Sequence, residues 1–245
     1  MSDLALPLAP TLAPLIAGDP REALDFIARA GFRYVQLSAA VPAMRPRELD
    51  RSARRDLLAR LRRIELTPAG LDLWIPEEHL LDTAQMDRAV AAMVDAVELA
   101  ADLGRIPLSI RLPEKTEPRH VAHLAQRAET CSVPLAQHGP AFPELPRGLD
   151  PAESILAGLD PALEAARAPL LVAARFSDAD RPGGAGRVTP GSGKLDILEY
   201  QVALLSRGFS RPVALDLRAL PQPRRIAVSC RDEWESTGIL HSPPS

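Results

Sequence analysis

The chain has 245 residues, of which 46% are hydrophobic and 25% charged, and its formal net charge is -3. This composition is typical of a globular protein with enough apolar material for a sizeable core, and it excludes an intrinsically disordered chain. The arginines are spread along the sequence and the charge balance is acidic, so nucleic acid is not an expected partner.

The cysteines and the apolar segments indicate the compartment. Cys131 and Cys230 lie far apart and form no CxxC pair, so we expect neither a disulfide framework nor a zinc knuckle. No run is long and apolar enough for a membrane span, and the proline-broken N-terminal segment has no basic region of the kind that precedes a signal sequence. We therefore expect a cytoplasmic protein with no membrane partner.

Short apolar runs alternate along the chain with longer runs of helical period, which is the pattern of βα units on a parallel sheet. In the first unit, residues 12–17 are expected to form a strand; Asp19 then caps a helix that begins at Pro20 and stops at Gly31. Further strands are expected at residues 32–38, 69–75, 107–112, 133–137, 148–150, 170–176 and 212–217. Further helices are expected at residues 48–64, 82–104, from 118 onward, 195–207 and 226–234.

Eight such units account for nearly the whole chain. This number favours a closed α/β barrel, a single (β/α)8 TIM barrel over residues 1–245, and disfavours an open doubly wound sheet. The pattern is weakest between residues 141 and 168. The Ser/Pro-rich end, HSPPS, is expected to be frayed over roughly the last ten residues.

Three segments carry a family resemblance: EALDFIARAGFRYVQLS, AVAAMVDAVELAADLG, and the run from RFSD through RVTPGSGKLDILEYQVALLSRGFSRPVALDLR. The last contains, in order, a polar strand end, a loop with PGxG, a helix and a strand with an acidic tip. In these features the chain resembles the xylose isomerase-like TIM-barrel family, which includes sugar-phosphate isomerases, epimerases and endonuclease IV. The resemblance implies one barrel domain that acts on a sugar or sugar phosphate.

The resemblance also implies a divalent metal site for Mn²⁺, Mg²⁺ or Co²⁺. The family's ligands are a Glu, an Asp, a His and a Glu at the ends of the fifth to eighth strands, and the matching positions here are Gln137, Asp150, Arg175 and Asp216. A guanidinium cannot bind a cation. We therefore expect a degenerate site, in which Gln137, Asp150 and Asp216 would be the ligands if a metal binds, and we favour a site without one.

In a βα barrel the working groups lie at the carboxyl ends of the strands. The predicted pocket therefore contains two catalytic candidates, Asp150 and Asp216, as acid/base groups or metal ligands. The predicted substrate-binding residues are Gln36, Asp72, Trp74, Arg111, Gln137, His138, Arg175 and Arg218.

Some of these residues have a structural interpretation beside the functional one. Asp72 and Trp74 alternate with leucines and so face one side, either the barrel mouth or the surface. Arg111 lies in an apolar strand, where it either binds a ligand or forms a salt bridge with Asp72 or Asp150. His138 follows Gln137, and the two cannot both face inward unless the strand has already ended. His138 is either a proton shuttle or a loop histidine with no role.

The seventh strand and its loop also leave alternatives open. Arg175 either holds an anionic or enediolate oxygen of the substrate or forms an ion pair with Asp178 or Asp216. Asp178 is expected to organise the loop that follows it. That loop is rich in glycine, and as a lid it would bring Arg181 or Arg187 to an anionic ligand.

Two functions follow from these residues. The leading one is a sugar or sugar-phosphate isomerase/epimerase that acts by proton transfer next to a carbonyl. The alternative is a catalytically silent barrel that binds a small polar metabolite or a partner protein. Either way, the expected ligand is a small polar or anionic metabolite, and the sequence leaves an oligomer open. An abasic-site endonuclease would need more metal ligands and a basic face.

Overall fold

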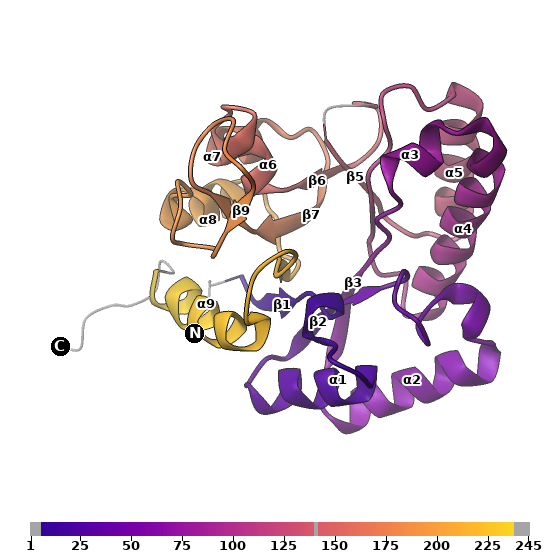
Figure 1. Cartoon of the computed structure of the whole chain (residues 1–245), viewed down its shortest axis with the longest axis horizontal. Coiled ribbons are helices and arrows are strands. Elements are labelled where there is room, and N and C mark those ends of the chain that lie inside the picture. The colour runs from indigo at the N-terminus through magenta and orange to yellow at the C-terminus, as the bar shows by residue number, and fades with distance from the viewer. Residues whose placement is uncertain (1–5, 140–141, 238–245) are drawn as a thin grey trace.

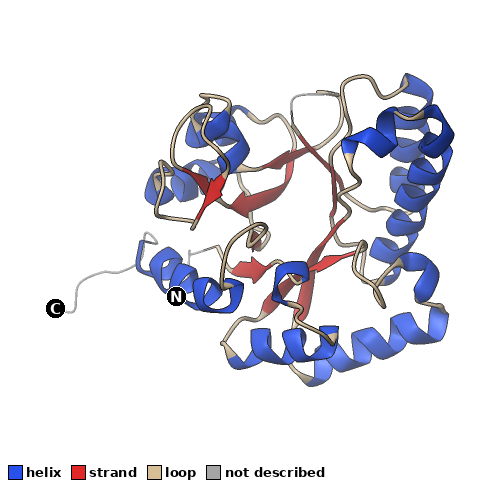
Figure 2. Cartoon of the chain, viewed as in Figure 1, coloured by secondary structure: helices blue, strands red, loops and turns tan. Residues whose placement is uncertain are grey.

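The structure is a computed structural model, and it describes residues 6–139 and 142–237. Parallel strands form a ring, and helices cover its outside (Figures 1 and 2). The ring contains β1 (Leu8–Pro10), β2 (Tyr34–Ser38), β3 (Thr67–Asp72), β4 (Leu108–Ile110), β5 (Leu135–His138), β6 (Arg147–Leu149), β7 (Leu171–Phe176) and β10 (Val213–Leu215). The outer layer contains α1 (Pro20–Arg29), α2 (Arg51–Arg63), α3 (Glu77–Leu81), α4 (Thr83–Asp102), α5 (Pro118–Thr130), α6 (Pro151–Leu156), α7 (Pro161–Arg167), α8 (Ile197–Ser206) and α9 (Pro223–Thr237).

The ring of strands closes on itself. The strands pair in the order β1-β10-β7-β6-β5-β4-β3-β2, and β1 meets β2 through a parallel bridge between Thr11 and Gln36. The Leu12 N–H also donates to the Gln36 carbonyl at 2.9 Å. The predicted (β/α)8 barrel is therefore confirmed. Two short strands outside the ring, β8 (Asp178–Ala179) and β9 (Arg187–Val188), form an antiparallel hairpin in the loop after β7.

Aspartates begin many of the helices, and two of them, Asp19 and Asp82, mark helix starts in the sequence. The Asp19 carboxylate accepts the Arg21 N–H at 2.8 Å, and the Asp50 carboxylate accepts the Ala53 N–H at 2.8 Å. Asp82, Asp160 and Asp196 cap α4, α7 and α8 in the same way. Each such cap contributes roughly 1 kcal/mol and fixes where a loop from the barrel rim turns into a helix.

The prediction for the first strand is wrong. The strand is Leu8–Pro10, and within the predicted range 12–17 the residues Ala13–Leu15 form a 3-10 helix, η1. The segment is apolar throughout, so its periodicity does not distinguish the two positions, and Pro14 favours the first turn of a helix. The weak region holds β6, α6 and α7, although residues 140–141 lie outside the described part. The expected frayed end at HSPPS also lies outside it.

Two glycines inside the barrel make room for polar side chains. A Cβ added at Gly70 would lie 2.6 Å from the Gln36 side-chain oxygen, and one added at Gly148 would lie 2.2 Å from His138 Nε2. Real Cβ atoms do not approach other atoms so closely. The glycines of β3 and β6 therefore allow the Gln36 and His138 side chains to lie across the barrel interior.

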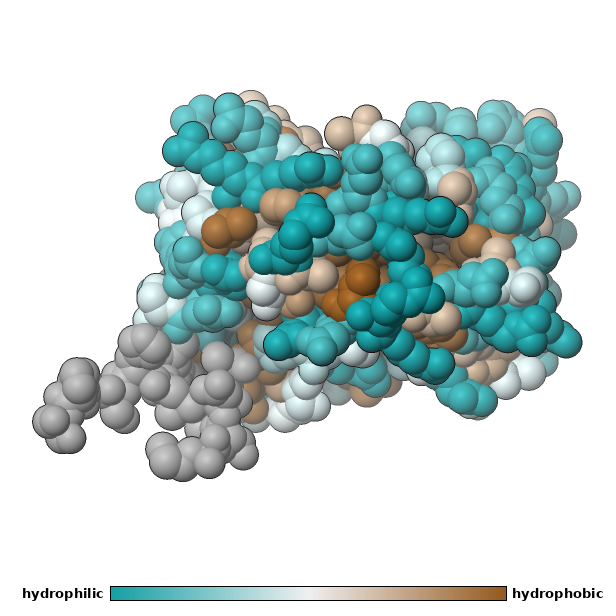
Figure 3. Space-filling model, turned by 90° about the horizontal axis from the view of Figure 1, so that it is seen from below, coloured by the Kyte–Doolittle hydropathy of each residue, from teal (hydrophilic) through white to brown (hydrophobic). Residues whose placement is uncertain are grey.

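The face of the barrel on the side of α1 and α2 is mainly polar. Seen from the side of α1 and α2, hydrophilic residues surround a smaller hydrophobic area (Figure 3). A groove there, between α1 and α2, has a volume of about 480 Å³ and is lined in part by Leu24, Met44 and Leu57.

Among residues 6–139 and 142–237, no helix is both long enough and apolar enough to cross a membrane.

Candidate functional site at the barrel mouth

Strand register brings polar side chains to the carboxyl ends of the strands. Ser38 pairs with Asp72, and Asp72 pairs with Ser109, so these side chains lie at one level inside the ring. On the other half of the ring, Ala214 pairs with Arg175, which aligns the end of β10 with that of β7. Because side chains alternate along a strand, Asp216, two positions after Ala214, points into the same mouth.

Arg175 lies at the centre of the mouth and is buried. Its guanidinium forms an ion pair with Asp72 on one side and, at 3.2 Å, with Asp216 on the other. Gln36 Nε2 donates to the Asp72 carboxylate at 2.7 Å. The ring of Trp74 lies 4.8 Å from the guanidinium carbon of Arg175. One cation therefore joins carboxylates from opposite sides of the barrel.

Two further arginines bind the aspartates that follow β6 and β10. Arg187 donates to Asp150 Oδ1 at 3.0 Å and Oδ2 at 2.5 Å, and lies 3.3 Å from Asp216. Arg218 donates to Asp216 Oδ2 at 2.5 Å and to Asp150 Oδ2 at 3.1 Å. The Ser177 hydroxyl donates to Asp150 at 2.7 Å. Both carboxylates are thus bound by two or more cationic or polar donors.

The charges are arranged in two layers. The side chains of Asp150 and Asp216 are only 2% and 0% exposed, whereas those of Arg187, Arg218 and Arg111 are 14%, 26% and 53% exposed. Carboxylates therefore form the floor, and guanidinium groups form most of the layer that solvent reaches. A molecule that enters the mouth meets hydrogen-bond donors first.

The arginines keep the floor ionised. Burial by itself would raise the pKa of Asp216, but Arg175 and Arg218 lower it to about 2. Burial likewise opposes ionisation of Asp150, yet Arg187 and Arg218 hold its pKa well below the usual range. A general base works best when its pKa is near the working pH. The two predicted catalytic aspartates are therefore poor proton acceptors at neutral pH.

His138 faces the barrel interior. Its Nε2 lies 3.2 Å from the Ser109 hydroxyl, and its ring packs edge-on against Trp74 at 5.2 Å. Burial, followed by the charge of Arg175, lowers the pKa of His138 well below 6.5. Nδ1 is buried and has no hydrogen-bond partner among the described residues.

Gln137 points away from the mouth, unlike His138. Its Oε1 accepts the Leu112 N–H at 3.0 Å, and its Nε2 donates to the Leu112 and His138 carbonyls at 3.3 and 3.0 Å. The sequence predicts both Gln137 and His138 in the pocket, with Gln137 at the metal-ligand position, but strand alternation turns only His138 toward the mouth. The Gln137 amide instead fixes the backbone that follows β4.

Of the open alternatives, the structure shows the barrel mouth for Asp72 and Trp74 and the ion pair for Arg175. Asp72 and Trp74 face it together, and Arg175 pairs with Asp216, one of the two expected partners, and with Asp72. Arg111 pairs with neither expected aspartate: it contacts Glu153 of α6 at 2.6 Å. Whether these residues bind substrate stays a prediction.

Asp178 organises the loop after β7. Its carboxylate, fully buried, accepts five backbone N–H groups, those of Ala179, Gly191, Gly193, Lys194 and Leu195, at 2.8–3.1 Å. This anchor supports the β8–β9 hairpin that carries Arg187 into the mouth. Arg181 instead lies at the surface beside Asp180.

Sequence reasoning missed Glu153 and Ser177. Glu153 lies in the first turn of α6, and Ser177 lies between Phe176 and Asp178, at the end of β7. Alternation on β7 from Arg175 would have indicated Ser177 as an inward residue. No local signal marks Glu153, because only the position of α6 brings it to Arg111.

Comparison with known proteins gives the fold. The sequence matches no protein-family profile and no curated protein. A xylose isomerase domain protein from Planctomyces limnophilus superposes with a TM-score of 0.78, at 16% identity, over 95% of this chain and 97% of that one. This chain has the xylose isomerase-like TIM-barrel fold.

Two further solved structures of this xylose isomerase-like fold agree. One is a xylose isomerase domain protein from Alicyclobacillus acidocaldarius, with TM-score 0.72, 18% identity, and coverage of 94% and 97%. The other is a D-tagatose 3-epimerase-like protein, with TM-score 0.71, 12% identity, and coverage of 94% and 97%. The chain therefore shares its architecture with isomerase- and epimerase-like barrels, and at these identities the likeness concerns the fold alone.

The residues of this xylose isomerase-like barrel do not fit the divalent metal that the family implies. Both carboxylates at the matching positions are bound by arginines, Arg175 replaces an imidazole with a cation, and the Gln137 oxygen is held by the Leu112 N–H. Among residues 6–139 and 142–237, no group of three or more His, Cys, Asp or Glu side chains is arranged to hold a metal. A cation placed here would face guanidinium groups.

Proposed function

We propose that this xylose isomerase-like barrel binds a small anionic metabolite at its mouth through guanidinium groups, without a divalent metal and without isomerase turnover. The order of charges supports this function: the exposed Arg111 and the partly exposed Arg218 lie above buried Asp150 and Asp216. Guanidinium groups bind carboxylates and phosphates through paired, charge-assisted hydrogen bonds.

Spare donors at the rim strengthen the proposal. A guanidinium has five N–H donors. Arg111 donates to Glu153 through Nη1 only, and Nη1 of Arg218 makes no hydrogen bond within the described residues. Trp74, 4.4 Å from the Arg218 guanidinium carbon, holds that group in place at the rim. The donors that face the buried carboxylates are therefore used, whereas donors that face solvent are available to a ligand.

The protonation of the floor disfavours acid–base chemistry by the aspartates. Proton transfer next to a carbonyl needs a group that both accepts and returns a proton near neutral pH. Arg175, Arg187 and Arg218 hold Asp150 and Asp216 in their ionised forms. These carboxylates serve to hold the arginines in place, and the arginines hold the ligand.

A second candidate is a sugar or sugar-phosphate isomerase/epimerase in which His138 transfers the proton. One observation favours it: Nδ1 of His138 is buried and has no partner among the described residues, which leaves this nitrogen available to a substrate. The lowered pKa of His138 weighs against it as a base. In this function Arg175 and Arg218 stabilise the enediolate oxygen.

One experiment separates the two. Aldoses, ketoses, their phosphates and small hydroxy acids are incubated with the protein in D2O, with EDTA or with Mn²⁺, and exchange of the proton next to the carbonyl is followed by NMR. Thermal denaturation is recorded with the same compounds. If a phosphate or carboxylate stabilises the protein in EDTA without proton exchange, the result supports the binding function. At a ligand concentration a hundredfold above Kd, the free energy of unfolding should rise by about 2.7 kcal/mol.

Controls connect the result to the mouth. Arg111→Ala removes the most exposed of the mouth arginines described above, and Arg167→Ala removes an exposed arginine at the end of α7. The first variant should lose the stabilisation, and the second should keep it. Exchange in EDTA that disappears in His138→Gln would support the second candidate, and exchange that requires Mn²⁺ would overturn both.

A further inference from the structure

A second concave site lies beside the mouth. It is a groove of about 480 Å³ between the segment after β2, the segment after β3 and helix α4. This volume is in the range of small-molecule sites. Trp74 and Leu73 line it on the side of β3, and Ala89 and Ala92 line it on the side of α4.

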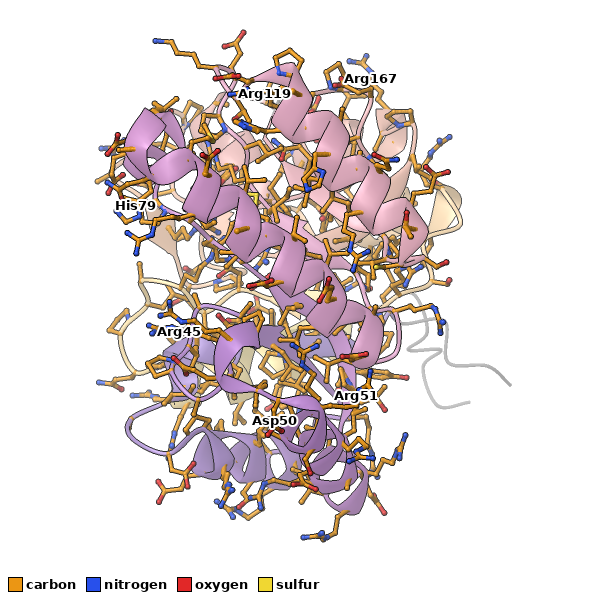
Figure 4. The ribbon with its side chains drawn as sticks, turned by 90° about the vertical axis from the view of Figure 1, so that its right-hand side faces the viewer. Arg45, Asp50, Arg51, His79, Arg119 and Arg167 are labelled. Carbon is orange, nitrogen blue, oxygen red and sulfur yellow. The ribbon has the colours of Figure 1, made fainter. Side chains whose placement is uncertain are left out.

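Positive charge collects in this groove. Arg45 and Arg47, from the segment after β2, and Arg88, from α4, all line it together with His79 of α3, and Asp95 is the acidic lining residue. Figure 4 shows Arg45 and His79 along the same edge of the molecule. The groove thus joins guanidinium groups from two separate elements of the chain.

The arginines of the groove are incompletely neutralised. Arg45 donates to the Ala40 carbonyl at 3.2 Å and lies 3.4 Å from Glu48, contacts that orient it. Arg47 and Arg88 are exposed, and neither has a hydrogen-bond or ion-pair partner within residues 6–139 and 142–237. Like charges that line one groove without a counterion repel one another, and an anion between them reduces that repulsion.

Trp74 connects the groove to the mouth. The residue lines the groove, while its ring lies 4.4 Å from the guanidinium carbon of Arg218. Its indole N–H is buried and has no acceptor within the described part of the chain. A buried N–H without a partner is destabilising, so a ligand oxygen that reached it at this junction would relieve that cost.

We propose that the groove binds the phosphoryl group of a small phosphorylated metabolite whose remaining hydroxyl or carbonyl oxygens extend past Trp74 to the mouth. A phosphoryl group offers three oxygens to several guanidinium donors at once. The phosphate site is inferred from the groove alone. The proposal that the rest of the ligand points to the mouth rests on the function proposed for the mouth. Arg47 and Arg88 contact the phosphoryl oxygens, and Arg45 supports them.

Titration with inorganic phosphate tests the site. Phosphate is added to the full chain by isothermal calorimetry at constant ionic strength, with chloride as the reference anion. The double variant Arg47→Ala/Arg88→Ala should bind phosphate at least tenfold more weakly, which corresponds to about 1.4 kcal/mol. The matched control Arg51→Ala/Arg167→Ala removes two exposed arginines outside the groove, which Figure 4 labels, and should bind phosphate as the natural protein does.

The outcomes distinguish this inference from the function of the mouth. If Arg111→Ala weakens phosphate binding tenfold and Arg47→Ala/Arg88→Ala leaves it unchanged, phosphate binds at the mouth and the groove proposal is overturned. An equal loss in Arg51→Ala/Arg167→Ala shows an effect of net charge and also overturns it. The groove proposal is supported if sugar phosphates bind the natural protein more tightly than the free sugars do, and if Arg47→Ala/Arg88→Ala binds sugar phosphates and free sugars with equal affinity.

Discussion

Asp178 and Asp216 are buried at the ends of neighbouring strands, yet they have opposite kinds of partner. Asp178 accepts five backbone N–H groups and has no ion-pair partner within the described residues. Asp216 lies among the guanidinium groups of Arg175, Arg187 and Arg218. A carboxylate bound by backbone fixes a loop, whereas one bound by side chains fixes cations that a ligand can reach.

The difference matters because the two regions depend on each other. The loop that Asp178 anchors carries Arg187, and Arg187 binds Asp150 at the floor of the mouth. Loss of the loop anchor should therefore loosen one arginine, whereas loss of a central arginine should leave charges buried without partners.

Arg175→Met should have the largest effect. It leaves Asp72 and Asp216 with one cation fewer in a buried site, and removing one partner of a buried ion pair costs about 3–5 kcal/mol. Denaturant unfolding measures this loss. Arg181→Met, at an exposed pair, should be nearly neutral.

A second substitution sharpens the test. In the Arg175→Met background, Asp72→Asn should recover part of the stability because it removes an unpaired buried charge. In the natural protein, Asp72→Asn should destabilise, because there it removes the partner of Arg175. The same sign in both backgrounds would contradict the ion-pair account.

Asp178→Ala should have the next largest effect. Five N–H groups lose a charged acceptor, and we expect a loss on the order of 2–3 kcal/mol, because the loop can relax and let water replace some bonds. Trypsin should then cleave after Arg187 or Lys194 faster than in the natural protein. Asp180→Ala, at the exposed neighbour, is the control; equal cleavage in the two variants would argue against an anchor.

The sequence was sufficient for most of the fold because its signals are local. Aspartate caps such as Asp19 and Asp82, followed by amphipathic periods, mark the helices in the sequence itself. The first strand was misplaced because Leu8–Pro10 is only three residues long within a uniformly apolar segment. Periodicity needs more residues than that to separate a strand from a 3-10 turn.

Only the site residues at the ends of strands could be predicted from the sequence. Arg175 and Asp72 are 103 positions apart, and the rule that barrel strands end at one mouth brought both into the predicted pocket. The rule does not say which charges pair, so Arg111 received the wrong partners. Glu153 comes from a helix, and its contact with Arg111 depends on how α6 packs beside the barrel.

His138→Gln tests the electrostatics of the mouth at neutral pH. Burial and Arg175 lower the pKa of His138 in the folded chain, whereas the unfolded chain takes up a proton near 6.5. The free energy of unfolding of the natural protein should therefore fall as pH drops below about 6.5, by up to about 1.4 kcal/mol per pH unit from this residue. Urea unfolding between pH 7.5 and 5 should show a slope smaller by that amount in the variant. Identical slopes would mean that the folded imidazole accepts a proton.

Arg111→Ala should have the smallest effect on stability, because the Arg111–Glu153 pair lies at the rim and its arginine is 53% exposed. Such pairs contribute about 0–1 kcal/mol. The substitution should nevertheless raise the pKa of Glu153 further: burial and Asp150 already raise it, and Arg111 is a cation that opposes them. NMR titration of the Glu153 carboxyl measures that shift, and urea unfolding measures the stability. A loss of several kcal/mol would mean that the Arg111–Glu153 pair belongs to the buried ion-pair network. The distinction between a buried layer of carboxylates and an accessible layer of donors would then be wrong.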